Sequence, residues 1–176
     1  DANGKITITL PVDKEVVLKF SKSGFIDQIK VLKLQEGTTS GAFIAAMLPR
    51  EPSQIIANIE NGGAANGKDG GTVSFPPSSL VDANGAPVTG AIDMAITPID
   101  VTRGDIAASP GLFEGVPESG PNAGVRVPIV SWGMAEFEPM QNGQKLQLAP
   151  GKTAIIEIPF YAFKNQDGTP VTLGQK

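Results

Sequence analysis

The sequence of 176 residues contains no cysteine and no histidine. The absence of cysteine excludes disulfide bonds and thiol nucleophiles, and the absence of histidine excludes imidazole metal ligands and the Ser-His-Asp triad. Carboxylates, Lys, Ser and Tyr are the groups that remain for acid–base or nucleophilic chemistry. We therefore expect no catalytic residues, no cofactor and no metal centre, and a protein that is not an enzyme.

Clustered positive charge and long apolar runs are also missing. The net charge is −4, and charged residues make up only 18% of the chain, with no basic run. Binding to nucleic acid or to an anionic membrane surface requires clustered cations, so neither partner is expected. No apolar stretch approaches the roughly 20 residues that cross a bilayer as a helix, so no membrane span is expected.

Glycine and proline, in contrast, are abundant, with 21 and 15 copies. They break regular structure often and favour short strands over long helices. The stretch "GGTVSFPPSSLVDANGAPVTG" (70–90) is typical: a glycine pair leads into a strand, two prolines end it, and Asn84-Gly85 forms a turn. Turn residues of this kind separate apolar runs along the whole chain, at about the ten-residue spacing of an antiparallel β-sandwich.

The runs themselves alternate with the period of two that a half-buried strand shows. We expect strands in "KITITL", "EVVLKF", "QIKVLKL", "QIIANI", "TVSF", "AIDMAITPID", "VRVPIVSWGMAEFEPM", "QKLQLAP", "KTAIIEIPFYAF" and "TPVTL", and a buried strand in "SGAFIAAMLPR". No segment is long enough for the crossover helix of a parallel sheet. The predicted fold class is all-β, built of antiparallel β-sandwich modules with short strands and Gly/Pro/Asn turns.

The composition changes near residue 50, which indicates a domain boundary. We expect a partial β-sandwich over 1–50, a connector over 51–69 with one weak strand in it, and a β-sandwich domain over 70–176.

Two parts of the chain resemble known families. "DANGKITITLP…EVVLKFSKSGF" is similar to the second half of a carboxypeptidase regulatory-like (transthyretin-like) domain, with Asp1-x-x-Gly4 before a strand and Gly24-Phe25 at a corner. "GGTVSFPPSSLVDANGAPVTGAIDMAITPID" and the later "IVSWGMAEFE" and "GQKLQLAPGKTAIIEIP" resemble the sandwich of ankyrins, netrin receptors and cartilage intermediate layer proteins, including bacterial surface-protein relatives.

These resemblances imply a non-catalytic structural, spacer or adhesion module of a secreted or cell-surface protein, located outside the cell or on the cell envelope. The alternative is a carbohydrate- or protein-binding module that uses its loops. Some relatives cleave themselves at a His-Phe-Ser site, but this chain has no histidine, so that chemistry is not carried over.

Two sites are candidates for recognition. Arg103-Gly104-Asp105 spells an integrin-binding tripeptide, which we interpret mainly as a capped turn and secondarily as an adhesion loop. Trp132, the only tryptophan, is a candidate ligand contact, although its apolar surroundings favour a place in the core.

Pairs of acidic residues allow two further interpretations. Glu136 and Glu138 could form a glycosidase pair, but charges two apart on a strand are more typical of a solvated face. "DANG" at 1–4 and 82–85 and "NQDG" at 165–168 offer too few oxygen ligands for a calcium loop and are predicted to be β-turns.

The apolar faces of the expected strands predict which residues form the core. We expect burial of Ile6, Ile8, Val17, Leu32, Val73, Phe75, Ile92, Met94, Ile96, Ile129, Trp132, Leu148, Ile156 and Ile158.

By the resemblance, about half of the first sandwich lies upstream of Asp1, and the second sandwich stops one strand short. Unpaired strand edges would then need a cover. We expect residues 5–50 to pack against a longer chain or a neighbouring subunit, which gives protein partners or self-assembly through exposed strand edges.

Overall fold

The structure, a computed structural model, describes residues 6–39, 41–42, 44–109, 114–164 and 169–170. These residues form antiparallel sheets joined by turns, among them three 3-10 turns, so the predicted all-β class is confirmed. The strands are β1 (Glu15–Phe20), β2 (Gln28–Lys33), β3 (Gln54–Ile56), β4 (Gly63–Asn66), β5 (Thr72–Phe75), β6 (Leu80–Val81), β7 (Ile92–Ile99), β8 (Glu114–Gly115), β9 (Val127–Pro128), β10 (Met134–Gln141), β11 (Gln144–Lys145), β12 (Gln147–Leu148) and β13 (Ile155–Glu157). The 3-10 turns are η1 (Ile59–Asn61), η2 (Lys68–Gly70) and η3 (Gly104–Ala108).

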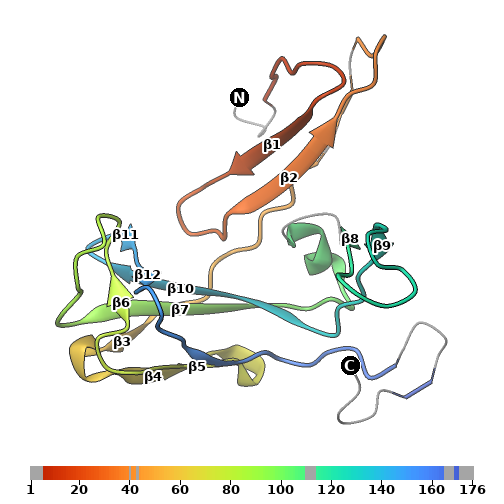
Figure 1. The fold of residues 1–176 in the computed structure, drawn as a ribbon. Helices are drawn as coiled ribbons and strands as arrows, with labels where there is room; N and C mark the ends of the chain where they lie inside the picture. The colour runs from red at the N-terminus through yellow and green to blue at the C-terminus, as the bar shows by residue number, and fades with distance from the viewer. Residues whose placement is uncertain (1–5, 40, 43, 110–113, 165–168, 171–176) are drawn as a thin grey trace.

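Two sheets face each other in the main body (Figure 1). One has the strand order β11-β10-β7-β3, and the other has the order β13-β5-β4, while β12 and β6 form a separate two-stranded sheet. The sheets meet at a corner where the Gln54 side chain of β3 bonds both backbone groups of Asn66 in β4. Residues 51–69, expected to be a connector, thus contribute β3, β4 and the turns around them to the sandwich.

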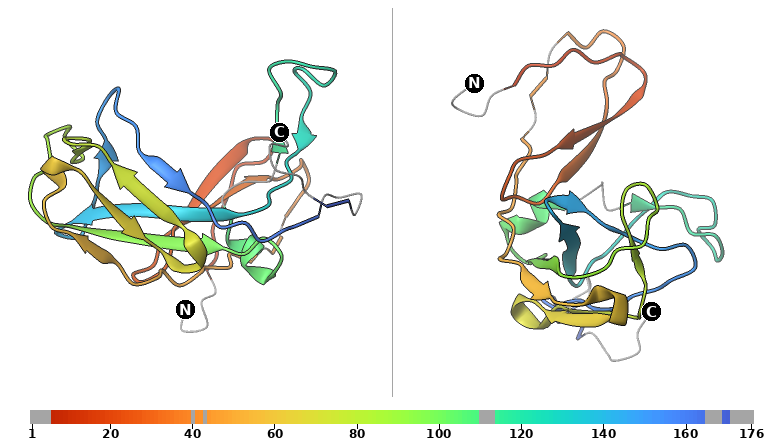
Figure 2. Two further views of the ribbon diagram at one scale, coloured as in Figure 1. Left: turned by 90° about the horizontal axis from the view of Figure 1, so that it is seen from below. Right: turned by 90° about the vertical axis from the view of Figure 1, so that its left-hand side faces the viewer.

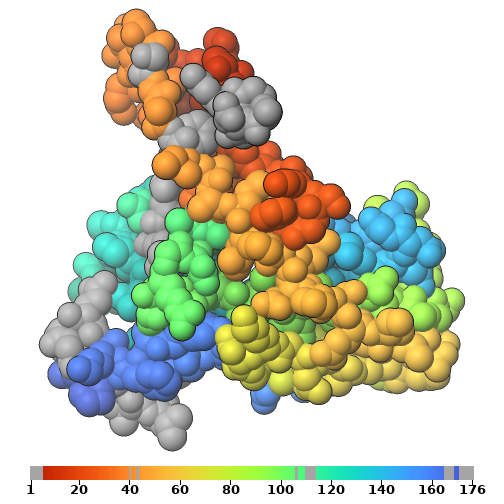
Figure 3. Space-filling view, turned by 180° about the vertical axis from the view of Figure 1, so that it is seen from behind, coloured from red at the N-terminus to blue at the C-terminus, as the bar shows by residue number. Residues whose placement is uncertain are grey.

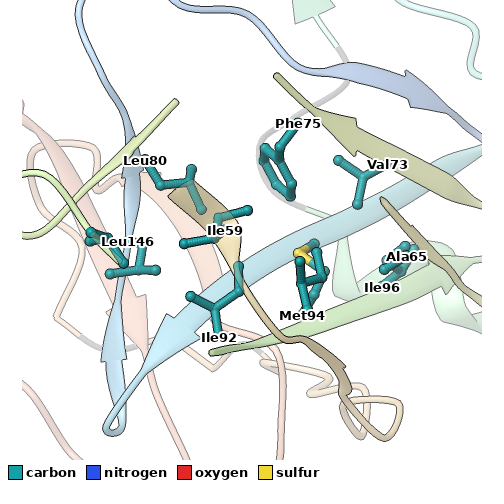
Figure 4. Close-up of a cluster of buried hydrophobic side chains, with 11 residues drawn as sticks. Ile59, Ala65, Val73, Phe75, Leu80, Ile92, Met94, Ile96 and Leu146 are labelled. Carbon is teal, nitrogen blue, oxygen red and sulfur yellow. The ribbon is translucent and has the colours of Figure 1, made fainter. Parts of the chain in front are cut away.

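The core lies between these sheets (Figure 4). It is formed by Ile56, Ile59, Ala65, Val73, Phe75, Leu80, Val88, Ile92, Met94, Ile96 and Leu146. Ile92, Met94 and Ile96 alternate along β7 and are 1–3% exposed, as their spacing predicts. Of the predicted core, Val73 and Phe75 are also buried.

Other members of the predicted core are not buried. Leu32 and Trp132 are only half-buried. Exposure between 42% and 64% is found for Ile6, Ile8, Val17, Ile129, Leu148, Ile156 and Ile158. Most of them share one cause: they lie on edge strands or outside any strand, with no second layer over them.

The N-terminal part is a single hairpin that projects from the sandwich (Figures 2 and 3). β1 and β2 pair in the register Glu15↔Lys33 to Phe20↔Gln28. The strand predicted in "KITITL" (5–10) is not formed by its described residues 6–10, because no strand in the described part of the chain lies beside them. The predicted buried strand in 40–50 is also wrong: residues 44–48 carry no ladder, and Ile44 is 87% exposed.

Two turns follow the predicted chemistry closely. Asp82 accepts hydrogen bonds from the backbone N–H groups of Asn84 and Ala86, at 2.9 and 2.8 Å, and Gly85 has a φ of 81°. This "DANG" is therefore a plain turn, while the copies at 1–4 and 165–168 lie outside the described residues, as does most of "TPVTL". Gly133 is needed for close approach, because a Cβ there would lie 1.8 Å from the Pro159 carbonyl oxygen.

Candidate functional site

The junction between the hairpin and the sandwich contains a cluster of charged side chains. We call it the charge cluster, and it comprises Lys19, Asp27, Arg50, Glu136, Glu138 and Lys145. Asp27 precedes β2, Arg50 ends the link from the hairpin, and the other acidic residues lie on β10. Three separate parts of the chain therefore meet at one point.

Glu138 is the centre of the charge cluster. Its side chain is only 4% exposed, and it forms ion pairs with Arg50 and, at 2.6 Å, with Lys145. Lys145 also donates to Asp27 at 2.8 Å, and Lys19 reaches the same Asp27 oxygen at 2.9 Å. A continuous chain of charges thus runs from the hairpin to the sheet.

Burial and pairing set the pKa values of this cluster. Burial alone would raise the pKa of Asp27, but hydrogen bonds from Lys145 and Lys19 hold it well below its usual range. Burial would lower the pKa of Lys145, yet hydrogen bonds with Asp27 and Glu138 raise it. Both groups therefore remain charged over the physiological range of pH.

Glu136 differs from its neighbours. None of the ion pairs among the described residues includes Glu136, whereas Glu138 has two; a carboxylate oxygen of Glu136, like both of those of Glu138, is buried without a hydrogen bond. Burial first, and the Glu138 charge second, raise the pKa of Glu136 to about 7. Glu136 therefore takes up a proton close to neutral pH.

The expectation that Glu136 and Glu138 form a solvated face is therefore wrong. They lie opposite Thr97 and Ala95 of β7, and both of those residues are buried. The segment after the hairpin covers this face: the Glu51 backbone N–H donates to Thr97 Oγ1, and Arg50 lies over Glu138. The period of two correctly placed both glutamates on one face but could not reveal what covers it.

The elevated pKa of Glu136 predicts a specific dependence of stability on pH. In the folded chain Glu136 keeps its proton up to about pH 7, whereas its ordinary value is 4.5, so stability falls as the pH rises between these values. We expect Glu136→Gln to raise the free energy of unfolding at pH 8 by about 1–2 kcal/mol, after allowance for partial exposure, and to change it little at pH 5. Denaturant titrations of both proteins at the two pH values measure this. An equal change at pH 5 and pH 8 would contradict the assignment.

A polar pocket of about 380 Å³ lies next to the end of β7. Its walls include Asp69, Asp100, Arg103, Asp105 and Tyr161. The Tyr161 hydroxyl donates to Asp69 at 2.7 Å, and burial together with Asp69 raises the Tyr161 pKa. The phenol therefore stays protonated and can donate hydrogen bonds, but it is not a nucleophile.

Arg103 and Asp105, the two charged residues of the Arg-Gly-Asp tripeptide, both line this pocket. They are not presented together at the tip of a loop. Arg103 forms an ion pair with Asp100 at 3.0 Å, while Asp105 is half-buried in η3. The turn is held by Asp100, whose carboxylate accepts hydrogen bonds from the backbone N–H and the hydroxyl of Thr102.

Trp132 does not line this pocket. Its ring is half-buried, with a centroid 6.2 Å from that of Phe160, and its backbone oxygen accepts from the Tyr161 and Ala162 N–H groups. The sequence did not single out Asp27, Arg50 and Lys145. Their only signal was isolated charge beside apolar runs, which does not identify partners far apart in the chain.

The charge cluster and the polar pocket both present charged or hydroxyl groups that can form hydrogen bonds and ion pairs. Glu136 and Glu138 lie on one strand, and the ion pairs of Glu138 leave little freedom for acid–base work. Within the described ranges, no group of three or more acidic side chains is arranged to hold a metal ion. No helix in the described part of the chain has the length and apolar character to cross a membrane.

The fold places the chain in the all-β antiparallel class, and comparison with known proteins does not narrow this class to a family. No family model, curated protein or solved structure matches the chain.

Proposed function

We propose that this chain is a non-catalytic structural, spacer or adhesion module of a secreted or cell-surface protein, and that it works within a longer chain or an assembly. The observation that carries the proposal is the charge cluster. Its ion pairs join the hairpin to the sandwich through Asp27, Lys145, Arg50 and the buried Glu138. A junction fixed in this way holds two parts of a module in one orientation, which a spacer requires.

Further contacts support a fixed junction. The Gln28 side chain is buried and donates to the Ala107 carbonyl of η3 at 2.6 Å, and Lys30 donates to the same oxygen. The backbone N–H of Ile26 donates to Leu48 and that of Arg50 donates to Gly24. The hairpin is thus attached at several points along its base.

The location outside the cell rests on the resemblance to carboxypeptidase regulatory-like domains and to the sandwich of ankyrins, netrin receptors and cartilage intermediate layer proteins. Protease treatment of intact cells that express the full-length gene tests it. We expect an antibody against this module to lose its signal without cell lysis, while a cytoplasmic control protein stays intact. Protection of the module until lysis would contradict a surface location.

A second candidate function is binding of a carbohydrate or a protein through the loops, and the polar pocket favours it. A volume of about 380 Å³ with convergent carboxylates, Arg103 and Tyr161 suits a polyol or a charged side chain. A glycan array tests this function. Loss of binding on Tyr161→Phe would place the ligand in the pocket, whereas loss on Trp132→Ala alone would place it at the tryptophan.

For the Arg-Gly-Asp tripeptide we predict that Asp105→Ala leaves integrin-dependent cell attachment unchanged. Arg103 is engaged by Asp100, and Asp105 is half-buried, so the two charges are not presented together to a receptor. Attachment of cells to the immobilised protein, with and without an integrin-blocking peptide, measures this. Attachment that the mutation abolishes would favour adhesion through this loop.

A further inference from the structure

One side of the sandwich is open at β13. β13 pairs with β5 along one edge, and no strand pairs with its other edge within the described residues. On the facing sheet, β10 pairs with β11 only at Met140 and Gln141, so its residues 134–138 also have a free edge in the described chain. Within the described ranges, both sheets thus end on this side without a partner strand along these residues.

The side chains confirm that this side is not covered. Ile156 lies opposite Val73, and directly opposed residues of an antiparallel pair point to the same face. Val73 is 1% exposed in the core, yet Ile156, on the same inner face, is 47% exposed. The chain beyond β13 continues with exposed Ile158 and Phe160. Inner-face apolar surface of this kind marks an interaction site.

The chain also contains a strand-like segment without a sheet. Ile6, Ile8 and Leu10 alternate with Thr7 and Thr9, a pattern typical of a half-buried strand. Residues 6–11 nevertheless form no strand, and Ile6 and Ile8 are 59% and 42% exposed. The apolar face of residues 6–10 is therefore exposed, and the free edge of β13 has no strand beside it among the described residues.

The same molecule does not bring these two elements together. The Asp13 backbone N–H donates to the Leu34 carbonyl at 2.8 Å, and Val12 bridges to Leu34, which fixes the segment to the hairpin. The hairpin lies on one side of the β7–β10 sheet and the blue β13 on the other (Figure 1). A second copy of the chain can supply the strand without this constraint.

We propose that residues 6–10 of a second copy add as a strand to the free edge of β13. The added strand satisfies the free backbone groups of β13, places Ile6, Ile8 and Leu10 over Ile156, and leaves Thr7 and Thr9 toward solvent. Donor and acceptor are different surfaces, so the contact is either exchanged reciprocally in a dimer or continued along a chain of copies. This interface rests on the assembly role proposed above and identifies the partner in that assembly as a second copy of the chain.

A complementation experiment tests the interface, because each copy carries one donor and one acceptor. Ile8→Asp disables the donor, Ile156→Asp disables the acceptor, and Ile44→Asp is a control at an exposed position outside both. We expect each of the first two variants to raise the dissociation constant of self-association roughly tenfold or more, since a carboxylate enters an apolar contact. The control is expected to associate like the unmodified chain.

Mixing decides between this interface and others. An equimolar mixture of Ile8→Asp and Ile156→Asp still has one good donor and one good acceptor, so we expect 1:1 dimers by sedimentation velocity. A mixture that stays monomeric, or self-association that survives in both variants, would overturn the interface while leaving the assembly role intact. A chain that shows no self-association at any concentration would overturn both the interface and the second copy as the partner.

A second measurement covers the case in which Ile156→Asp does not fold. The sequence has no cysteine, so a mixed dimer of one chain with Ile8→Cys and another with Ile156→Cys contains one defined disulfide, and its mass can distinguish it from the two homodimers when one chain carries a tag. We expect a disulfide-linked dimer of the two chains under oxidation. A link of equal yield between Ile44→Cys and Ile156→Cys would show random collision and overturn the interface.

Discussion

Replacing Ile92 by alanine is expected to lower the free energy of unfolding by about 2–5 kcal/mol. Ile92 is 2% exposed and packs in the core on β7, the strand between β3 and β10. Removing its side-chain carbons leaves a cavity that two flanking strands cannot easily close. Urea titration, followed by the fluorescence of the single Trp132 or by circular dichroism, measures the change.

A matched control lies on the neighbouring strand. Ile55 pairs with Asp93 in the same sheet but is 74% exposed. We expect Ile55→Ala to cost less than about 0.5 kcal/mol, as for most surface substitutions. Equal costs at the two positions would show that the inner face of this sheet is assigned incorrectly.

The second large effect is expected at Glu138. Glu138→Gln keeps the shape of the side chain but leaves Arg50 and Lys145 without their shared buried counter-charge. We expect a loss of about 3 kcal/mol, near the lower end of the range for breaking a buried pair, because Asp27 still holds Lys145. The hairpin is expected to loosen as well, which faster hydrogen exchange of its amides would report.

An exposed ion pair serves as the control for Glu138. Glu114 and Arg126 are 3.2 Å apart, with side chains 40% and 58% exposed. We expect Glu114→Gln to change stability by at most about 1 kcal/mol, the usual value for a surface pair. If Glu138→Gln were equally mild, the charge cluster would not hold the hairpin on the sandwich.

The sequence predicted strands well where a partner strand is present. In β7 the alternation of Ile92, Met94 and Ile96 matches the buried face, because β3 and β10 pair with its two edges and the facing sheet covers its inner face. Residues 6–10 show the same alternation but form no strand, since a strand exists only through hydrogen bonds to a neighbour. Local pattern carries no information about whether that neighbour is present.

The candidate site was less predictable for a related reason. Glu136 and Glu138 were correctly placed on one face, but the cover over that face comes from Arg50 and Asp27, which are distant in the sequence. Burial converts these residues from a solvated pair into a charge cluster. An alternating pattern indicates which face of the strand a residue occupies. Only the tertiary fold shows which residues cover that face.

Sedimentation equilibrium of the chain over a wide concentration range tests the central claim, that the open sandwich works within an assembly. We predict reversible self-association, because the uncovered apolar face of β13 and the exposed segment 6–10 of different copies cover each other. A well-folded monomer at every concentration, with a sharp two-state melt, would contradict the claim.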